Sequence, residues 1–224
     1  AYRAIELEPD NANHHDAMGT LAWDMGDPER AAAGFRKAVM LEPGRAAAWS
    51  NLGSAIKPSG RSEAALTALA RAVTAAPGLV EAHRNIGVQL AAMTDMDGAR
   101  TAYARALALD PADTGLAFKA AMTFNTIPQS VAEIDAIRDG ITQDLEKLRG
   151  SGGRIEDPMA EVGLPNFHLA YHGRDDRDIQ TTIARTYLEL CPGLGWRARH
   201  CQAPSPRAPG EPIKIGFFSV FLHE

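Results

Sequence analysis

The sequence is poor in cysteine, in aromatic residues and in long apolar runs. It has two cysteines, Cys191 and Cys201, which do not suggest a secreted disulfide framework, so a reducing cytoplasm fits best. Aromatic residues make up 6% of the chain while alanine is abundant, which favours closely packed helices over a β-sandwich. No apolar run approaches the roughly 20 residues that span a bilayer, and no signal-peptide pattern is present. We therefore expect no membrane association.

An excess of positive charge is also missing. The formal net charge is −5, and a chain without a basic field has nothing that attracts a phosphate backbone, so we expect no nucleic-acid partner. The 224 residues suffice for a repeat array and a piece of another domain. Both ends are expected to be cut from a longer protein, because the chain starts in a helical pattern and stops in an apolar one.

The sequence does contain a strict period of 34 residues, with proline at positions 9, 43, 77 and 111. Aligned on these prolines, small and bulky residues recur in register: Gly19, Gly53 and Gly87; Ala31, Ala65 and Ala99; Phe35, Leu69 and Tyr103; Ala38, Ala72 and Ala106. This pattern resembles the tetratricopeptide repeat (TPR), a helix-turn-helix unit. The predicted fold class is all-α, a right-handed TPR α-solenoid of antiparallel helix pairs, followed by linker helices and one β-strand of an incomplete α/β domain of the GT-B type.

The recurring residues are expected to form the core of the helix pairs. In the middle unit one face of the first helix is formed by Trp49, Leu52, Gly53 and Ile56. The residues of the second helix expected to pack against this face are Ala65, Leu69 and Ala72. Gly53 lets the two helices approach closely. The prolines end the helices, while Asp27 and Pro28 form an N-cap and a first turn. Function must therefore come from other positions.

Asn51 and Asn85 are the candidate substrate-binding residues. In TPR arrays the first helix of each unit lines the concave surface, and each asparagine lies just before the glycine of its unit. A carboxamide both donates and accepts hydrogen bonds, which suits binding of a polypeptide backbone. The preceding unit interrupts the series with Ala17. A second interpretation is that asparagine is simply frequent at this repeat position.

After the repeats, residues 114–125 are expected to form one more first-type helix that caps the array, with no second helix in register. Ser130 and Glu133 form a capping box, which predicts a long amphipathic helix over about 130–149. Two further helical segments are expected at 167–172 and 178–190, with residues 157–164 irregular. The proline-rich stretch 204–212 reads as a linker.

The order of parts resembles bacterial proteins of the SPINDLY/O-GlcNAc transferase family, glycosyltransferase family 41. The stretches that carry this resemblance are the repeats, Phe167-His168-Leu169-Ala170-Tyr171-His172-Gly173-Arg174, Cys191-Pro192, the proline-rich linker and Ile213-Lys214-Ile215-Gly216-Phe217-Phe218-Ser219. The predicted division is 1–11, the end of a truncated repeat; 12–45, 46–79 and 80–113, complete repeats; 114–127, a capping helix; 128–203, a helical linker region; 204–212, a proline-rich linker; and 213–224, the start of a glycosyltransferase catalytic domain.

The resemblance implies a parent enzyme that moves a sugar from a UDP-sugar donor to Ser or Thr of a protein, without a required metal. In the family a functional His follows nine residues after the glycine of the first catalytic strand. Nine residues after Gly216 is the position that would follow Glu224, and His223 is its neighbour, not its equivalent. The chain itself is thus expected to hold no catalytic residue and no cofactor, and to bind a protein or peptide acceptor on the concave TPR face. A homodimer through the convex face stays open.

His168 and His172 are spaced as two ligands on one helix face, with Glu161 nearby in sequence, but packed and hydrogen-bonded histidines are the interpretation we favour over a metal site. The acidic run 175–178 is interpreted as helix capping, with Asp178 as the N-cap. The alternative to a transferase segment is a non-enzymatic TPR adaptor or co-chaperone scaffold.

Overall fold

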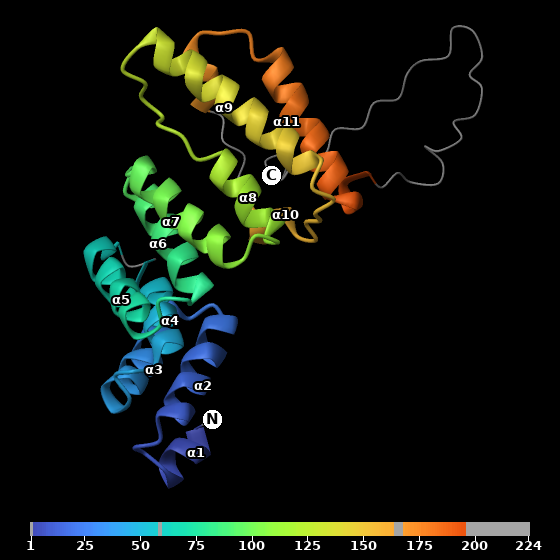
Figure 1. Cartoon of the computed structure of the whole chain (residues 1–224). Helices are drawn as coiled ribbons and strands as arrows, with labels where there is room; N and C mark the ends of the chain where they lie inside the picture. Colours follow the sequence, from blue (N-terminus) through green and yellow to red (C-terminus); the bar gives the residue numbers. More distant parts are fainter. Residues whose placement is uncertain (1, 58–59, 164–167, 196–224) are drawn as a thin grey trace, which may run out of the picture. The chain divides into compact units, whose positions relative to one another are not determined.

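A computed structural model describes residues 2–57, 60–163 and 168–195, and Figure 1 shows their arrangement. The helices of the repeat region are α1 (Tyr2–Leu7), α2 (Ala12–Asp24), α3 (Pro28–Leu41), α4 (Ala46–Ile56), α5 (Ser62–Ala75), α6 (Val80–Ala92) and α7 (Met96–Leu109). The helices that follow are α8 (Thr114–Ala121), α9 (Val131–Arg149), α10 (Pro158–Glu161), the 3₁₀ segment η2 (His168–His172), α11 (Arg177–Leu190) and the 3₁₀ segment η3 (Pro192–Gly195).

Consecutive helices pack as antiparallel pairs, α2 on α3, α4 on α5 and α6 on α7. The first helices also contact one another directly, α2 with α4 and α4 with α6. We call the exposed side of α2, α4, α6 and α8 the first-helix surface. Within this arrangement Ala31, Ala65 and Ala99 are fully buried, which confirms the small core positions read from the sequence. The repeat thus packs its signature residues inward and leaves the first-helix surface to other side chains.

Side-chain caps and ring contacts stabilise the starts of these helices. Asp27 caps α3 by accepting from the Arg30 N–H, and Asp95 and Asp113 cap α7 and α8 in the same way. In α2, α4 and α6 a ring nitrogen also binds the carbonyl of the proline that precedes the helix. The three contacts are His15 Nε2 with Pro9 O at 2.7 Å, Trp49 Nε1 with Pro43 O at 2.8 Å and His83 Nε2 with Pro77 O at 2.9 Å. These three hydrogen bonds therefore connect the turns at Pro9, Pro43 and Pro77 to the helices that follow them.

The helix predicted over 130–149 is present as α9. Ser130 accepts from the Glu133 N–H, but the Glu133 carboxylate accepts from the Gln129 N–H in place of the Ser130 N–H that a standard capping box uses. The prediction that no second helix follows in register stands. Position 130 lies 34 residues after Met96, but α9 starts one residue later at Val131, and Glu133 occupies the place that Ala99 has in the preceding unit. The packing of α9 also differs from that of α3, α5 and α7, because α9 pairs mainly with α11.

Helices α9 and α11 form the main pair of the region after the repeats. Three ion pairs join the two segments: Arg138 with Asp176 at 2.7 Å, Arg149 with Glu189 at 2.8 Å and Arg174 with Asp135 at 3.0 Å. A backbone hydrogen bond from Ile155 N to Leu190 O at 2.8 Å fastens the intervening turn. The core of this region is a cluster of its own that includes Phe118, Ile141, Leu145, Leu169 and Leu190.

Two local predictions for this region are wrong. Residues 158–161 form the short helix α10, because Asp157 accepts from the N–H groups of Met159 and Ala160 and Pro158 fits a first turn. Asp178 is not the N-cap of α11, since the helix begins at Arg177 with Asp176 in the cap position. Asp176 instead uses its carboxylate on Arg138, which offsets the charge of both groups.

The predicted fold class also needs correction. Every regular element among the described residues is helical and none is a strand, so the β-strand of an incomplete α/β domain is not part of the fold found here. The segment 213–224 on which it was predicted lies outside the described residues. The physical reason is that a strand exists through hydrogen bonds to a neighbouring strand, and the described chain supplies none. The all-α TPR class itself is correct.

Candidate functional site

The structure brings Asn51 and Asn85 together in one pocket of about 290 Å³. We call it the asparagine pocket; its lining residues are Thr20, Trp23, Phe35, Asn51, Ser54 and Asn85. They come from α2, α3, α4 and α6, so three consecutive first helices contribute to it. The pocket combines hydroxyl and carboxamide groups with an aromatic wall, since the Trp23 side chain remains 45% exposed.

The two asparagines differ in how they are held. The Asn85 side-chain amide donates to Ser50 Oγ at 3.1 Å, and Ser50 is only 2% exposed. This bond fixes the orientation of the Asn85 carboxamide and leaves its oxygen available as an acceptor. Asn51 is exposed, and its carboxamide has no hydrogen-bond partner among the described residues. Both side chains therefore retain hydrogen-bonding capacity toward the pocket.

The same repeat position continues beyond Asn85. Thirty-four residues after Asn85 is Lys119 on α8, so the first-helix surface presents Ala17, Asn51, Asn85 and Lys119 in register. Sequence reasoning missed Lys119 because it compared only the three complete repeats. Counting one further period from Asn85 would have found it.

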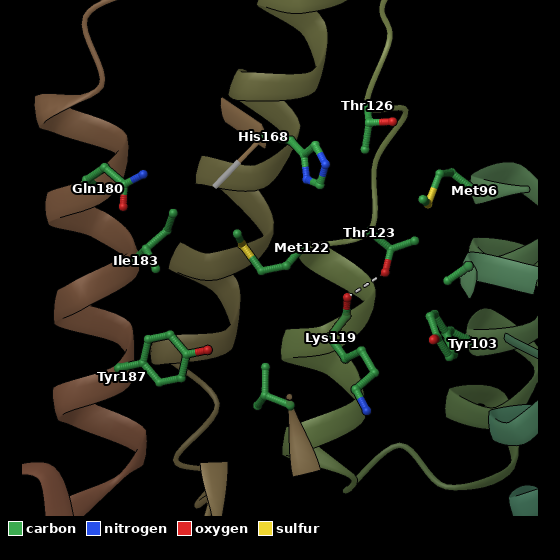
Figure 2. A pocket seen from close by; sticks show the side chains of 12 residues that line it. Met96, Tyr103, Lys119, Met122, Thr123, Thr126, His168, Gln180, Ile183 and Tyr187 are labelled. Carbon is green, nitrogen blue, oxygen red and sulfur yellow. Dashed lines mark hydrogen bonds between the residues drawn. The ribbon is translucent and has the colours of Figure 1, made fainter. Parts of the chain in front are cut away.

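Lys119 lines a second pocket, of about 320 Å³, which we call the lysine pocket. Its lining includes Met96, Tyr103, Lys119, Met122, Ile183 and Tyr187, from α7, α8 and α11. Figure 2 shows Lys119 on α8 and Met122 just after it, with Tyr103 on one side and Ile183 and Tyr187 on the other. The residues from α11 could not be found from sequence, because they reach the pocket only through the packing of the region after the repeats.

The charges around Lys119 leave its ammonium group without a close counterion. Burial, Arg84 and Lys57 together lower the pKa of Lys119 from its ordinary value, and Asp113 acts against them. Asp113 is itself bonded to Arg84. No carboxylate forms an ion pair with Lys119 within the part of the chain that the structure describes. Burial also raises the pKa of Tyr103 to about 12, so its hydroxyl stays neutral at physiological pH.

His168 and His172 lie together in η2, near α9 and α11. His172 is 5% exposed and packs edge-on against Phe124, with ring centroids 5.8 Å apart. Neither of its ring nitrogens has a hydrogen-bond partner among the described residues, so the expected packing of this histidine is found there without the expected hydrogen bond. Glu161 is not used with them, because its carboxylate accepts from the N–H groups of Glu156 and Asp157. No group of three or more metal-ligating side chains gathers within residues 2–57, 60–163 and 168–195.

Residues 17–79 and 59–114 match the family model described as Tetratricopeptide repeat. The match covers the stretch in which the structure shows three helix pairs in a 34-residue register. Residues 17–114 are tetratricopeptide repeats. No curated protein matches the sequence significantly. None of the helices among the described residues is long and apolar enough to cross a bilayer.

Several solved structures share this TPR fold. The chain resembles MamA with a TM-score of 0.57 and 23% identity, over 66% of this chain and 81% of that one. It resembles PilF of Pseudomonas aeruginosa with a TM-score of 0.59 and 20% identity, over 84% of this chain and 79% of that one. A mutant O-GlcNAc transferase from Thermobaculum terrenum matches with a TM-score of 0.52 and 20% identity, over 61% of this chain but 26% of that one. At these identities the likeness is one of fold.

Proposed function

We propose that the first-helix surface binds an extended polypeptide and that Asn51 and Asn85 hydrogen-bond to its main chain. The observation that carries the proposal is the asparagine pocket, in which equivalent residues of two consecutive repeats line one hollow. An extended backbone presents N–H and C=O groups at regular intervals, and a carboxamide can serve either kind. Contacts of this sort select for an exposed chain and tolerate many sequences.

The remaining walls of the pocket suit the same ligand. Trp23 offers an exposed aromatic face, and Thr20 and Ser54 add hydroxyl groups that donate or accept. Buried Ser50 holds Asn85 in place before any ligand arrives, so less conformational entropy is lost on binding. A preorganised polar contact beside an apolar wall is the arrangement expected for a peptide with alternating side chains.

We further propose that this binding surface is the acceptor-recognition segment of a protein O-GlcNAc transferase-like glycosyltransferase, which uses a UDP-sugar donor. The support is the order of sequence motifs: the repeats, the stretch Phe167 to Arg174, Cys191-Pro192 and the proline-rich linker. The TPR fold alone is equally compatible with a scaffold that has no chemistry, since stacked repeats by themselves provide a binding surface and no reaction. A test of glycosyltransferase activity in the parent protein distinguishes the transferase from the scaffold.

The double variant Asn51→Ala/Asn85→Ala tests the binding site. Two lost hydrogen bonds of about 0.5–1.5 kcal/mol each predict a roughly 5- to 150-fold weaker Kd for acetylated, amidated peptides selected on the wild-type chain. Fluorescence anisotropy measures this directly. In a parent enzyme the same variant should weaken protein acceptors and spare hydrolysis of the UDP-sugar.

Two control variants isolate the effect. Gln143→Ala removes an exposed carboxamide from α9, outside the pocket, and should leave Kd unchanged. Ser50→Ala removes the group that orients Asn85 and should weaken binding by less than the double variant does. Unchanged affinity in Asn51→Ala/Asn85→Ala, with its helical content and unfolding midpoint preserved, would refute the proposed function. Equal loss of acceptor modification and donor hydrolysis would refute the transferase assignment alone.

A further inference from the structure

The lysine pocket lies one repeat beyond Asn85 on the first-helix surface. Lys119 stands in the position that Asn51 and Asn85 hold in their repeats, so a polypeptide that follows the asparagines reaches α8 next. At this position the carboxamide of the two asparagines is replaced by the positively charged ammonium group of Lys119. This change alters what the surface recognises, because an ammonium group donates only and favours an anionic acceptor.

We propose that the lysine pocket receives an acidic side chain of the bound polypeptide, whose carboxylate pairs with Lys119, together with an apolar side chain next to it. This inference rests on the proposed function and specifies the chemistry of the polypeptide. The occupant is an internal Asp or Glu of an extended segment.

Charge complementarity supports a carboxylate at this place. The nearby acid, Asp113, is engaged by Arg84, so the local balance of Arg84, Lys119 and Asp113 is one positive charge. A half-buried ammonium group without a counterion carries a desolvation cost, and an incoming carboxylate offsets it. The chain as a whole has a net charge of −5, so this positive site is a local exception and not part of a general basic surface.

The walls of the pocket support an apolar side chain beside the acid. Met122, the cap residue after α8, lines it together with Ile183 and Tyr187 of α11, and Figure 2 shows the three on the same side of α8. The Tyr187 ring is anchored by the Phe118 ring, with centroids 4.4 Å apart. Apolar walls exclude water and thereby strengthen an ion pair formed among them. The neutral Tyr103 hydroxyl is a further donor in the lining.

Two peptide pools test the proposal by fluorescence anisotropy. Both contain labelled, acetylated and amidated 12-residue peptides, randomised among Ala, Leu, Ser and Glu in one pool and among Ala, Leu, Ser and Gln in the other. The wild-type chain is expected to bind the Glu pool about 10-fold more tightly, as for one charge-assisted hydrogen bond. This preference should shrink as salt is raised, because the pocket stays open to solvent.

The decisive variant is Lys119→Gln, which should weaken the Glu pool far more than the Gln pool and thereby remove the preference for Glu. Lys119→Arg should retain the preference. Arg36→Gln is the matched control: it also lowers the net charge by one, but it removes an exposed cation of α3 and should keep the roughly 10-fold ratio.

The outcomes separate this inference from the proposed function. If Lys119→Gln keeps the wild-type ratio, or if a Gln pool with free C-terminal carboxylates binds better than the Glu pool, the assignment to an internal acidic residue is overturned. Asn51→Ala/Asn85→Ala should weaken both pools equally and preserve the ratio. If it weakens neither, the proposed function fails, whatever the Lys119 variants do.

Discussion

Gly34 is the residue at which α3 comes closest to α2. A Cβ atom built there would lie 2.8 Å from both Gly19 N and His15 O, which are backbone atoms and cannot rotate away. Gly34→Ala is therefore expected to lower the free energy of unfolding by about 1–3 kcal/mol through overpacking. Urea denaturation followed by circular dichroism measures the loss.

Gly140 provides the matched control for that substitution. It lies inside α9, and an added Cβ would meet nothing within 4 Å. Gly140→Ala should therefore raise the free energy of unfolding by about 0.5–1 kcal/mol, because alanine restricts the unfolded chain and favours the helix. A neutral Gly34→Ala would mean that α2 and α3 separate at little cost, and the close approach would then not be a source of stability.

At the same scale, the sequence predicted some close approaches and missed others. Gly19, Gly53 and Gly87 recur every 34 residues, and all three are buried against the second helix of their own unit, as predicted. Gly34 gave no signal, because the equivalent residues are Ala68 and Ala102. Whether two helices lie so close that only glycine fits depends on how they pack, and the residue at one position does not reveal this. The hydrogen bond from Asn85 to Ser50 likewise depends on how α4 and α6 pack, so it could not be predicted from the sequence.

Whole elements could be predicted wherever local signals and periodicity agreed. The six helices α2 to α7 combine caps, prolines and a repeated apolar face, and each lies where the register places it. After α8 the 34-residue period no longer locates the helices. The prediction that residues 157–164 are irregular missed α10, and the prediction of Asp178 as the cap of α11 was wrong. The ring contacts to the proline carbonyls were also hidden, because two histidines and one tryptophan fill one role with different chemistry.

The packing of η2 against α9 and α11 predicts a pH dependence of stability. His172 is buried, and burial together with Arg138 lowers its pKa below the ordinary 6.5, although Asp176 acts in the opposite direction. The unfolded chain therefore takes up this proton at higher pH than the folded one. The stability that neutral His172 contributes is complete above about pH 6.5 and is lost as the pH falls toward its folded pKa, by at most about 1.4 kcal/mol per pH unit.

His172→Phe isolates this contribution, because phenylalanine does not titrate and can still pack against Phe124. Urea unfolding is compared at pH 7.5, 6.5 and 5.5 for wild type and variant. Between pH 6.5 and 5.5 the wild type should lose more stability than His172→Phe, and the other histidines cancel in the difference. Parallel curves for the two proteins would show that His172 takes up its proton in the folded state without penalty.

At the scale of the described molecule, the hydrophobic core is divided among three clusters. One cluster spans α2 to α5 and includes Phe35, Leu52 and Ala68. Another includes Tyr103 and Leu116, and the third includes Leu145. In a repeat protein each unit contacts mainly its neighbours, so stability is approximately a sum of local terms. No strand occurs among the described residues, and a short apolar pattern cannot specify the partner strands on which the predicted strand depends.

Because the core is divided into clusters, a cavity in one cluster is expected to destabilise only the helices that contribute to that cluster. Leu145→Ala removes a fully buried side chain from α9, at a cost of about 2–5 kcal/mol. Hydrogen exchange should accelerate in α9 and α11 and stay at wild-type rates in α2 to α5, which share no residue with that cluster. The reciprocal variant Leu52→Ala should accelerate exchange in α2 to α5 and spare α9 and α11. Uniform acceleration in either variant would instead mean that the repeats and the helices after them unfold as one cooperative unit, because opening would then require the whole core to separate at once.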